Sequence, residues 1–159
     1  DMIGGGLITS FDGDGFVFDT ELFVRYCQVA AYFPMMQFSR MPWRVLSAKE
    51  TAICLDAVNR HIKLADYIMN EVEKISKSGE PILRSLEYEY PHCGYAQITD
   101  EFLLGSDILV APQLNKGEKS RKVIIPSGEW ADERGKIYSQ GEYTIDTPID
   151  VIPVFYKKS

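Results

Sequence analysis

The sequence has 159 residues, 45% of them hydrophobic and 25% charged, which is an ordinary composition for a globular protein. The formal net charge is −6 and no block of lysines or arginines occurs, so we expect neither a nucleic-acid partner nor binding to an anionic membrane. No run approaches the roughly 20 apolar residues of a membrane span, and no secretory signal opens the chain. The sequence starts without an initiator methionine, so we expect a piece of a longer protein and leave its localisation open.

The first predicted elements are a short apolar segment at 2–4, followed by glycines, and a helix over 20–33. Asp19 precedes that helix, and its carboxylate is suited to accept the free amide hydrogens of the first turn. Helical spacing predicts one apolar face, made of Leu22, Tyr26, Val29, Ala30 and Phe33.

The next predicted elements are a buried strand at 35–38 and one long helix ending before Gly79. The sequence MMQF does not alternate, which is typical of a strand buried on both faces. Ser47 and Glu50 have the spacing of a capping box at the start of the long helix. Buried strands alternating with helices indicate βαβ units of a parallel sheet, and we expect more such units upstream.

From Pro81 the rhythm changes to short strands separated by turn signals, which is typical of an antiparallel sandwich. ILRSLEYEY alternates and predicts a strand, with Glu87 and Glu89 on one face of it. Only TDEFLLG, at 99–105, suggests a short helix. The boundary between the two halves falls near 76–81.

Motifs alone predict no reaction. Asp12–Gly15, DGDG, resembles the start of a calcium loop, but the spacing then fails. Glu87 and Glu89 are not opposed across a substrate, and neither His61 nor His92 belongs to a set with metal-ligand spacing. The cysteines are three, far apart and odd in number, which favours free structural thiols at Cys27, Cys54 and Cys93. We therefore expect no metal and no cofactor.

Six stretches, taken in order, carry a resemblance to a known family. They are DMIGGG (1–6), DTELFVRYCQVAAYFPMM (19–36), PWRVL (42–46), EPILRSLEYEYP (80–91), DEFLLGSDILVAPQLNKGEKSRKVIIPSGEWAD (100–132) and DVIPVF (150–155). Together they resemble the C-terminal part of a glycoside hydrolase family 31 enzyme, the family of α-glucosidases and α-xylosidases. The resemblance covers nearly the whole chain, and its stretch over 100–132 is long and specific.

This resemblance implies the last two βα units of a (β/α)8 TIM barrel in residues 1–78, the seventh and eighth, and an antiparallel β-sandwich domain in residues 79–159. The family hydrolyses glycosides with retention through two aspartates, whose motifs this chain does not contain. Because retention needs both carboxyl groups, roughly 5 Å apart, we expect the fragment alone to be inactive. The implied substrate of the parent enzyme is an oligosaccharide or glycoside.

The residues that the resemblance assigns to substrate binding follow the two predicted strands, where reacting groups of such barrels lie. Ser39 and Arg40 would lie at the mouth of the barrel. The family commonly has an Arg-Asn-His run at the positions of Gln37, Phe38 and Ser39, and its histidine bonds a sugar hydroxyl. It commonly has an aromatic residue where Gly5 stands. We expect an altered sugar specificity.

Two further expectations concern partners. The alternative function is a non-catalytic carbohydrate-binding or assembly module that uses the sandwich alone. It would need an exposed aromatic platform, and Trp130 is the only tryptophan of residues 79–159. We favour packing for Trp130, and solvent exposure of its ring separates the two alternatives. The fragment is also expected to self-associate through exposed strands at 2–4 and 35–38, or else to leave its first residues poorly ordered.

Overall fold

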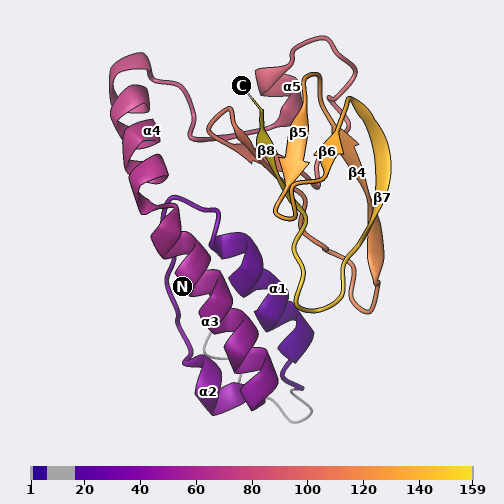
Figure 1. Ribbon diagram of the computed structural model, residues 1–159. Coiled ribbons are helices and arrows are strands. Elements are labelled where there is room, and N and C mark those ends of the chain that lie inside the picture. Colours follow the sequence, from indigo (N-terminus) through magenta and orange to yellow (C-terminus); the bar gives the residue numbers. More distant parts are fainter. Residues whose placement is uncertain (1, 7–16, 159) are drawn as a thin grey trace. The chain divides into compact units, whose positions relative to one another are not determined.

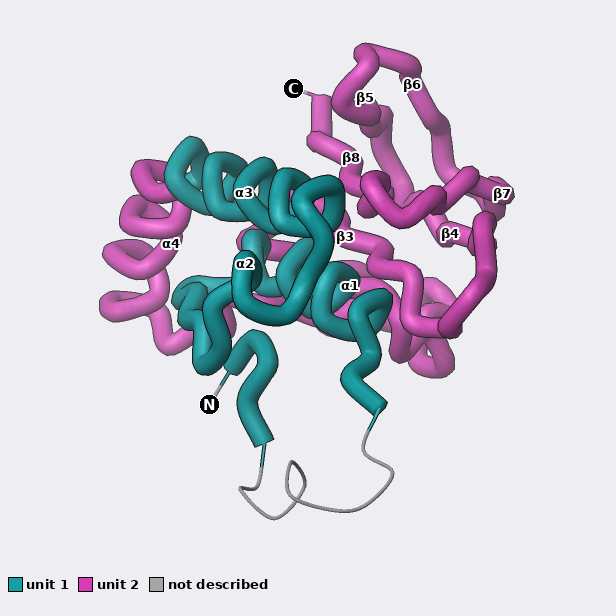
Figure 2. The backbone as a smooth tube through the Cα atoms, turned by 90° about the horizontal axis from the view of Figure 1, so that it is seen from below, with its two compact units in different colours: residues 1–64 teal, residues 65–159 magenta. Residues whose placement is uncertain are grey.

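A computed structural model describes residues 2–6 and 17–158 (Figure 1). The chain divides into two compact units, residues 1–64 and residues 65–159 (Figure 2). The sequence DGDG at 12–15 lies outside the described residues. Among the described residues, no helix combines the length and the apolar composition that a membrane crossing requires.

The first unit contains the helices α1 (Thr20–Ala30), α2 (Pro42–Val45) and α3 (Ala48–Lys63). Both predicted caps are confirmed. The Leu22 amide donates to Asp19 Oδ1 at 2.9 Å, and the capping box of Ser47 and Glu50 has both of its hydrogen bonds.

Helices α1 and α3 pack through small and polar contacts. The Cys27 thiol lies 3.8 Å from the carbonyl oxygen of Cys54, and His61 Nδ1 lies 3.0 Å from the carbonyl oxygen of Ala31. The neighbouring Cys54 and burial both raise the pKa of Cys27. The three cysteines are free, as predicted, and His61 has a structural contact.

The predicted apolar face of the first helix is wrong in part. Leu22 is 64% exposed, whereas Phe23 is buried. The buried residues of α1 are Phe23, Val24, Cys27, Gln28 and Ala30. The face turns toward Phe23 because its ring packs near those of Phe18 and Phe38, at 5.7 and 6.5 Å between centroids.

The two predicted strands of the first unit meet in one parallel bridge, between Ile3 and Phe38. Ile3 is fully buried, but Met35 is 68% exposed, so the prediction of a wholly buried strand at 35–38 is wrong for this chain. A parallel strand buried on both faces needs neighbouring strands and covering helices. Within the described residues, only Ile3 pairs with this segment.

The single long helix predicted before Gly79 is divided into α3 and α4 (Ala65–Ser78). Leu64 separates them with φ −86° and ψ −5°, away from ideal helical values. Gly79 ends α4 as predicted, with φ +77° and its amide bonded to the carbonyl oxygen of Ile75 at 2.8 Å.

After α4, the second unit contains two antiparallel sheets, in the arrangement expected of a β-sandwich (Figure 1). Over the described residues, the larger sheet has the order β1-β2-β3-β8-β5-β6 and the smaller sheet pairs β4 with β7. Their bounds are β1 Leu83–Arg84, β2 Phe102–Leu104, β3 Ile108–Val110, β4 Ser120–Ile125, β5 Trp130–Asp132, β6 Ile137–Tyr138, β7 Gly141–Asp146 and β8 Val154–Lys157.

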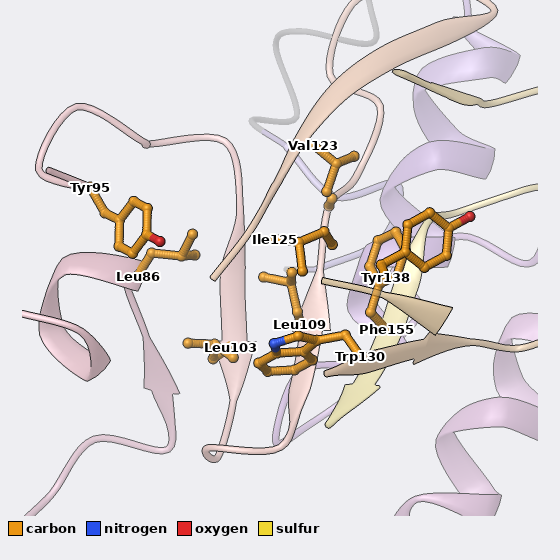
Figure 3. Close-up of a cluster of buried hydrophobic side chains, with 10 residues drawn as sticks. Leu86, Tyr95, Leu103, Leu109, Val123, Ile125, Trp130, Tyr138 and Phe155 are labelled. Carbon is orange, nitrogen blue, oxygen red and sulfur yellow. The ribbon is translucent and has the colours of Figure 1, made fainter. Parts of the chain in front are cut away.

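Both sheets contribute to one buried core, and the labelled side chains point into the same space in Figure 3. The core consists of Leu86, Tyr95, Leu103, Leu109, Ala111, Val123, Ile125, Trp130, Tyr138 and Phe155. The Trp130 ring has 0% exposure, so it packs as predicted and offers no platform for a sugar. Nearly complete burial of such aromatic rings is a large favourable term in folding.

Two predictions near the start of the sandwich are wrong in whole or in part: the strand predicted over 82–90 is confirmed at β1 but not at 86–89, and the helix predicted over 99–105 is wrong. Residues 86–89 form the short helix α5 (Leu86–Glu89) where we predicted a strand, because Ser85 caps it by accepting the Tyr88 amide at 3.1 Å. The segment predicted as a helix contains strand β2, which pairs with both β1 and β3. Its Leu103 and Leu104 are fully buried.

A buried ion pair links the two sheets. Glu101, directly before β2, accepts the Ile124 amide at 2.9 Å and the Arg121 guanidinium at 3.2 Å, both from β4. Arg121 also binds the Asp100 carboxylate at 2.9 Å. Glu101 Oε2 is buried and has no hydrogen-bond partner among the described residues. Burial raises the pKa of Glu101 to about 7, although the Ile124 amide and Arg121 oppose the shift.

This raised pKa predicts a loss of stability as the pH rises. In the folded state Glu101 binds a proton more tightly than in the unfolded state, whose reference value is 4.5. Its contribution is therefore full below pH 4.5 and is lost as the pH rises through about 7. The shift in pKa corresponds to a decrease in the free energy of unfolding on the order of 3 kcal/mol between low pH and a pH above 7. Urea unfolding, followed by Trp130 fluorescence in a Trp43→Phe background, measures it.

The matched variants are Glu101→Gln, which cannot titrate, and Glu118→Gln at an exposed position. We expect Glu101→Gln to flatten the dependence of unfolding free energy on pH between 5 and 7, and Glu118→Gln to leave it unchanged. An equal slope for the parent chain and Glu101→Gln would contradict the prediction.

Candidate functional site

The candidate site lies where the segments 2–5 and 37–40 run side by side in the first unit. The Ile3 amide donates to the carbonyl oxygen of Gln37 at 3.1 Å, and the Ser39 amide donates to that of Ile3 at 2.9 Å. Because the two segments are parallel, the residues that follow each one emerge at the same edge. The pairing therefore brings Gly5 to the same edge as Ser39 and Arg40.

Gly4 lets the two segments approach. The Gly5 amide bonds the carbonyl oxygen of Met2 at 3.0 Å, which closes a tight turn with Gly4 at its third position. Gly4 has φ +72°, a conformation that favours glycine. A Cβ atom there would lie 2.6 Å from the Phe23 ring and 3.1 Å from Arg40 Cβ. The turn thus packs directly against the residues of the site.

Aromatic rings surround these residues. The guanidinium carbon of Arg40 lies 5.8 Å from the centre of the Phe18 ring, within reach of a cation–π contact. Phe18 packs near Phe23, which in turn packs near Phe38. Arg40 is half-buried beside this cluster. These contacts restrict the position of the guanidinium group, which is the one charged group among the four predicted site residues.

The remaining predicted site residues face solvent. Gly5, Gln37 and Ser39 are exposed. The edge near Arg40 is therefore bordered by the backbone of Gly5, the side-chain amide of Gln37 and the hydroxyl of Ser39. Such groups donate and accept hydrogen bonds but are weak as general acids or bases. The arrangement is suited to hold a polar ligand and does not by itself supply acid–base chemistry.

The other titratable candidates have structural contacts. Glu89 forms an ion pair with Arg84 at 2.6 Å, and Glu87 accepts the His92 amide at 3.0 Å. They belong to α5, so the predicted placement of both on one strand face is wrong. Among residues 2–6 and 17–158, no group of three or more His, Cys, Asp or Glu side chains could hold a metal ion.

Sequence reasoning missed Gly4 and the aromatic cluster. The signal for Gly4 was available in the run of three glycines, but nothing in that run distinguishes the one residue with positive φ. Phe23 lies on the side of α1 that the helical spacing left outside the predicted face, and Phe18 comes just before the helix. Their contacts depend on Phe38, which is distant in sequence and packs near Phe23 in the fold.

Comparisons with known proteins agree with the resemblance found in the sequence. The sequence profile described as "Glycosyl hydrolase family 31 C-terminal domain" matches residues 79–159. Myogenesis-regulating glycosidase of Mus musculus is 35% identical, over 98% of this chain and 22% of that protein. A family 31 dextranase of Flavobacterium johnsoniae, solved with glucose, has a TM-score of 0.80 at 30% identity, over 87% of this chain and 18% of its own.

A family 31 sulfoquinovosidase from E. rectale, solved with an aza-sugar inhibitor, has a TM-score of 0.85 at 26% identity. That match covers 99% of this chain and 24% of the other. The chain therefore belongs to glycoside hydrolase family 31. It spans 22% of the length of each of two curated relatives that it matches.

Proposed function

We propose that this chain is part of a retaining α-glycosidase that hydrolyses O-glycosidic bonds in carbohydrate metabolism. Residues 1–78 supply the seventh and eighth βα units of its (β/α)8 barrel, and residues 79–159 supply the sandwich that follows the barrel. The observation that carries the proposal is the parallel pairing of Ile3 with Phe38. It supports the barrel assignment because neighbouring strands of such barrels are parallel and place their substrate-binding residues at one end.

The four residues at that edge have separate roles in the proposal. Arg40, positioned by Phe18, and Ser39 bind polar groups of the sugar. Gly5 leaves open the volume that an aromatic residue commonly fills in the family, and Gln37 borders the same opening. Relatives solved with glucose and with an aza-sugar inhibitor support a carbohydrate ligand. The nucleophile and the acid/base belong to other parts of the whole enzyme.

The proposal predicts activity for the whole protein and none for the isolated chain. A whole protein that carries this sequence should hydrolyse an aryl α-glycoside and release the α-anomer first, as observed by NMR during the first turnovers. The purified 159-residue chain should show no turnover of the same substrates, because one wall of a pocket cannot replace two opposed carboxyl groups.

Release of the β-anomer first would contradict retention in the whole protein. Turnover by the isolated chain would contradict the assignment of the nucleophile and the acid/base to other parts of the enzyme. The activity would have to co-purify with the chain and be lost when the chain is unfolded.

Replacement of Ser39 by histidine should change sugar preference in the whole protein. An imidazole at this edge would add a hydrogen-bond partner for a sugar hydroxyl, so the ratio of kcat/KM between two epimeric α-glycosides should shift by about 1–3 kcal/mol. Ser127→His, at an exposed loop position of the sandwich, is the matched control. An unchanged ratio for Ser39→His would mean that residue 39 does not touch the sugar.

The isolated chain should also associate through its paired segments. Phe38 turns its N–H and C=O away from Ile3, and no described residue bonds them. A second copy can pair with that edge, and Met35 beside it is exposed. Light scattering should therefore show more than a monomer for the parent chain.

Two substitutions separate edge pairing from contact through the Phe38 ring. Phe38→Ala and Phe38→Pro both remove the ring, but only proline removes the outward N–H. We expect the alanine variant to associate and the proline variant to be monomeric. A monomeric parent chain with both segments ordered would show that the edge does not need a partner.

A further inference from the structure

Helix α4 lies before the sandwich in the sequence but inside the second compact unit, which begins at Ala65. Its buried side chains are Ile68 and Glu71. A buried carboxylate on a helix is costly unless another group compensates for its charge. The Lys74 ammonium lies 2.5 Å from Glu71 Oε1 and provides that compensation from the next turn of the helix.

The buried side of α4 faces the turn that joins β2 to β3. The Tyr67 hydroxyl donates to the carbonyl oxygen of Leu104 at 3.0 Å. Gly105, the next residue, has φ +60°. A Cβ atom on Gly105 would collide with the Tyr67 hydroxyl and would lie 2.9 Å from Glu71 Oε2. The helix and the turn are therefore in direct contact, at a distance that glycine allows.

Polar groups of the sandwich complete this contact. Burial raises the pKa of Tyr67, and the nearby Asp107 and Glu71 raise it further, so its hydroxyl stays protonated and able to donate. Arg84 of β1 interacts favourably with the charge of Glu71. Arg84 is itself held by Ser106 at 2.7 Å, in the same turn as Gly105. The contact between α4 and the sandwich thus includes a hydrogen bond from Tyr67 and a favourable interaction between the charges of Glu71 and Arg84.

We propose that α4, the last helix of the segment assigned above to the barrel, is held by the sandwich and unfolds together with it. The cooperative unit then begins at Ala65, ahead of residues 79–159, which the family profile matches. The contact of Tyr67 and Glu71 with Gly105 couples the helix to the sheet. Helix α3, which precedes α4 in the chain, belongs to the first unit. On this proposal it unfolds separately from α4. This proposal does not depend on the enzymatic activity.

Native-state hydrogen exchange of the full chain tests the proposal. In rising sub-denaturing urea, amides that open in one cooperative event converge on one free energy of opening. We expect the amides of α4 to converge with those of β2, β3 and β8, and apart from those of α1 and α3. Convergence of α4 with α3, or independent opening of α4, would overturn the proposal.

Two alanine variants with similar backbone strain identify the contact responsible. Gly105→Ala and Gly117→Ala both place a side chain at positive φ, +60° and +79°, but no atom of the described residues lies within 4 Å of a Cβ atom at Gly117. We expect Gly105→Ala to speed exchange in α4 about tenfold or more relative to Gly117→Ala. Equal effects in α4 would contradict the role of Gly105. If Gly105→Ala does not fold, exchange in the unsubstituted chain still decides the proposal.

Discussion

The parallel pairing of Ile3 with Phe38 is the interaction on which the candidate site depends. Two backbone hydrogen bonds join segments that are far apart in sequence, and they set which residues emerge side by side. Parallel pairing requires a crossover between the segments, which includes helix α1. Phe23 from α1 packs near Phe38 and would collide with any side chain at Gly4. One small region thus determines the turn, the helix face and the position of Arg40.

The sandwich is held together mainly by side-chain packing. Its two sheets bury aromatic and aliphatic side chains around Trp130, and most of its stability comes from that shared apolar core. Glu101 departs from this pattern because its carboxylate links the sheets while one oxygen stays buried with no hydrogen-bond partner in the described part of the chain. The link with Arg121 aligns β4 over the larger sheet, and burial of Glu101, which raises its pKa, predicts a stability that depends on pH.

The sequence predicted those parts of the fold that depend on contacts between residues close together in the chain. Asp19 and Ser47 cap helices with their own side chains, and strands such as 120–125 show in turn signals and composition. The predictions failed where distant contacts decide. The alternating residues at 86–89 predicted a strand, but Ser85 caps a short helix there. Phe102–Leu104 was predicted as a helix, but it pairs with strands on both sides. For the site, the resemblance supplied Gly5, Gln37, Ser39 and Arg40, whereas Gly4 and Phe18 emerged only from tertiary packing.

In the whole protein, Ile3 and Phe38 should lie on neighbouring strands of a larger parallel sheet. Amide exchange at single residues, measured by NMR, tests it most directly, because alternate amides of a strand point to opposite sides. In the isolated chain, at concentrations where it is monomeric, the Ser39 amide should be protected and the Phe38 amide should exchange rapidly. The Phe38→Ala variant, which keeps the backbone amide, should give the same pattern. In a whole family 31 protein that carries this sequence, both amides should be protected. An amide at Phe38 that stays unprotected in the whole protein would contradict the claim.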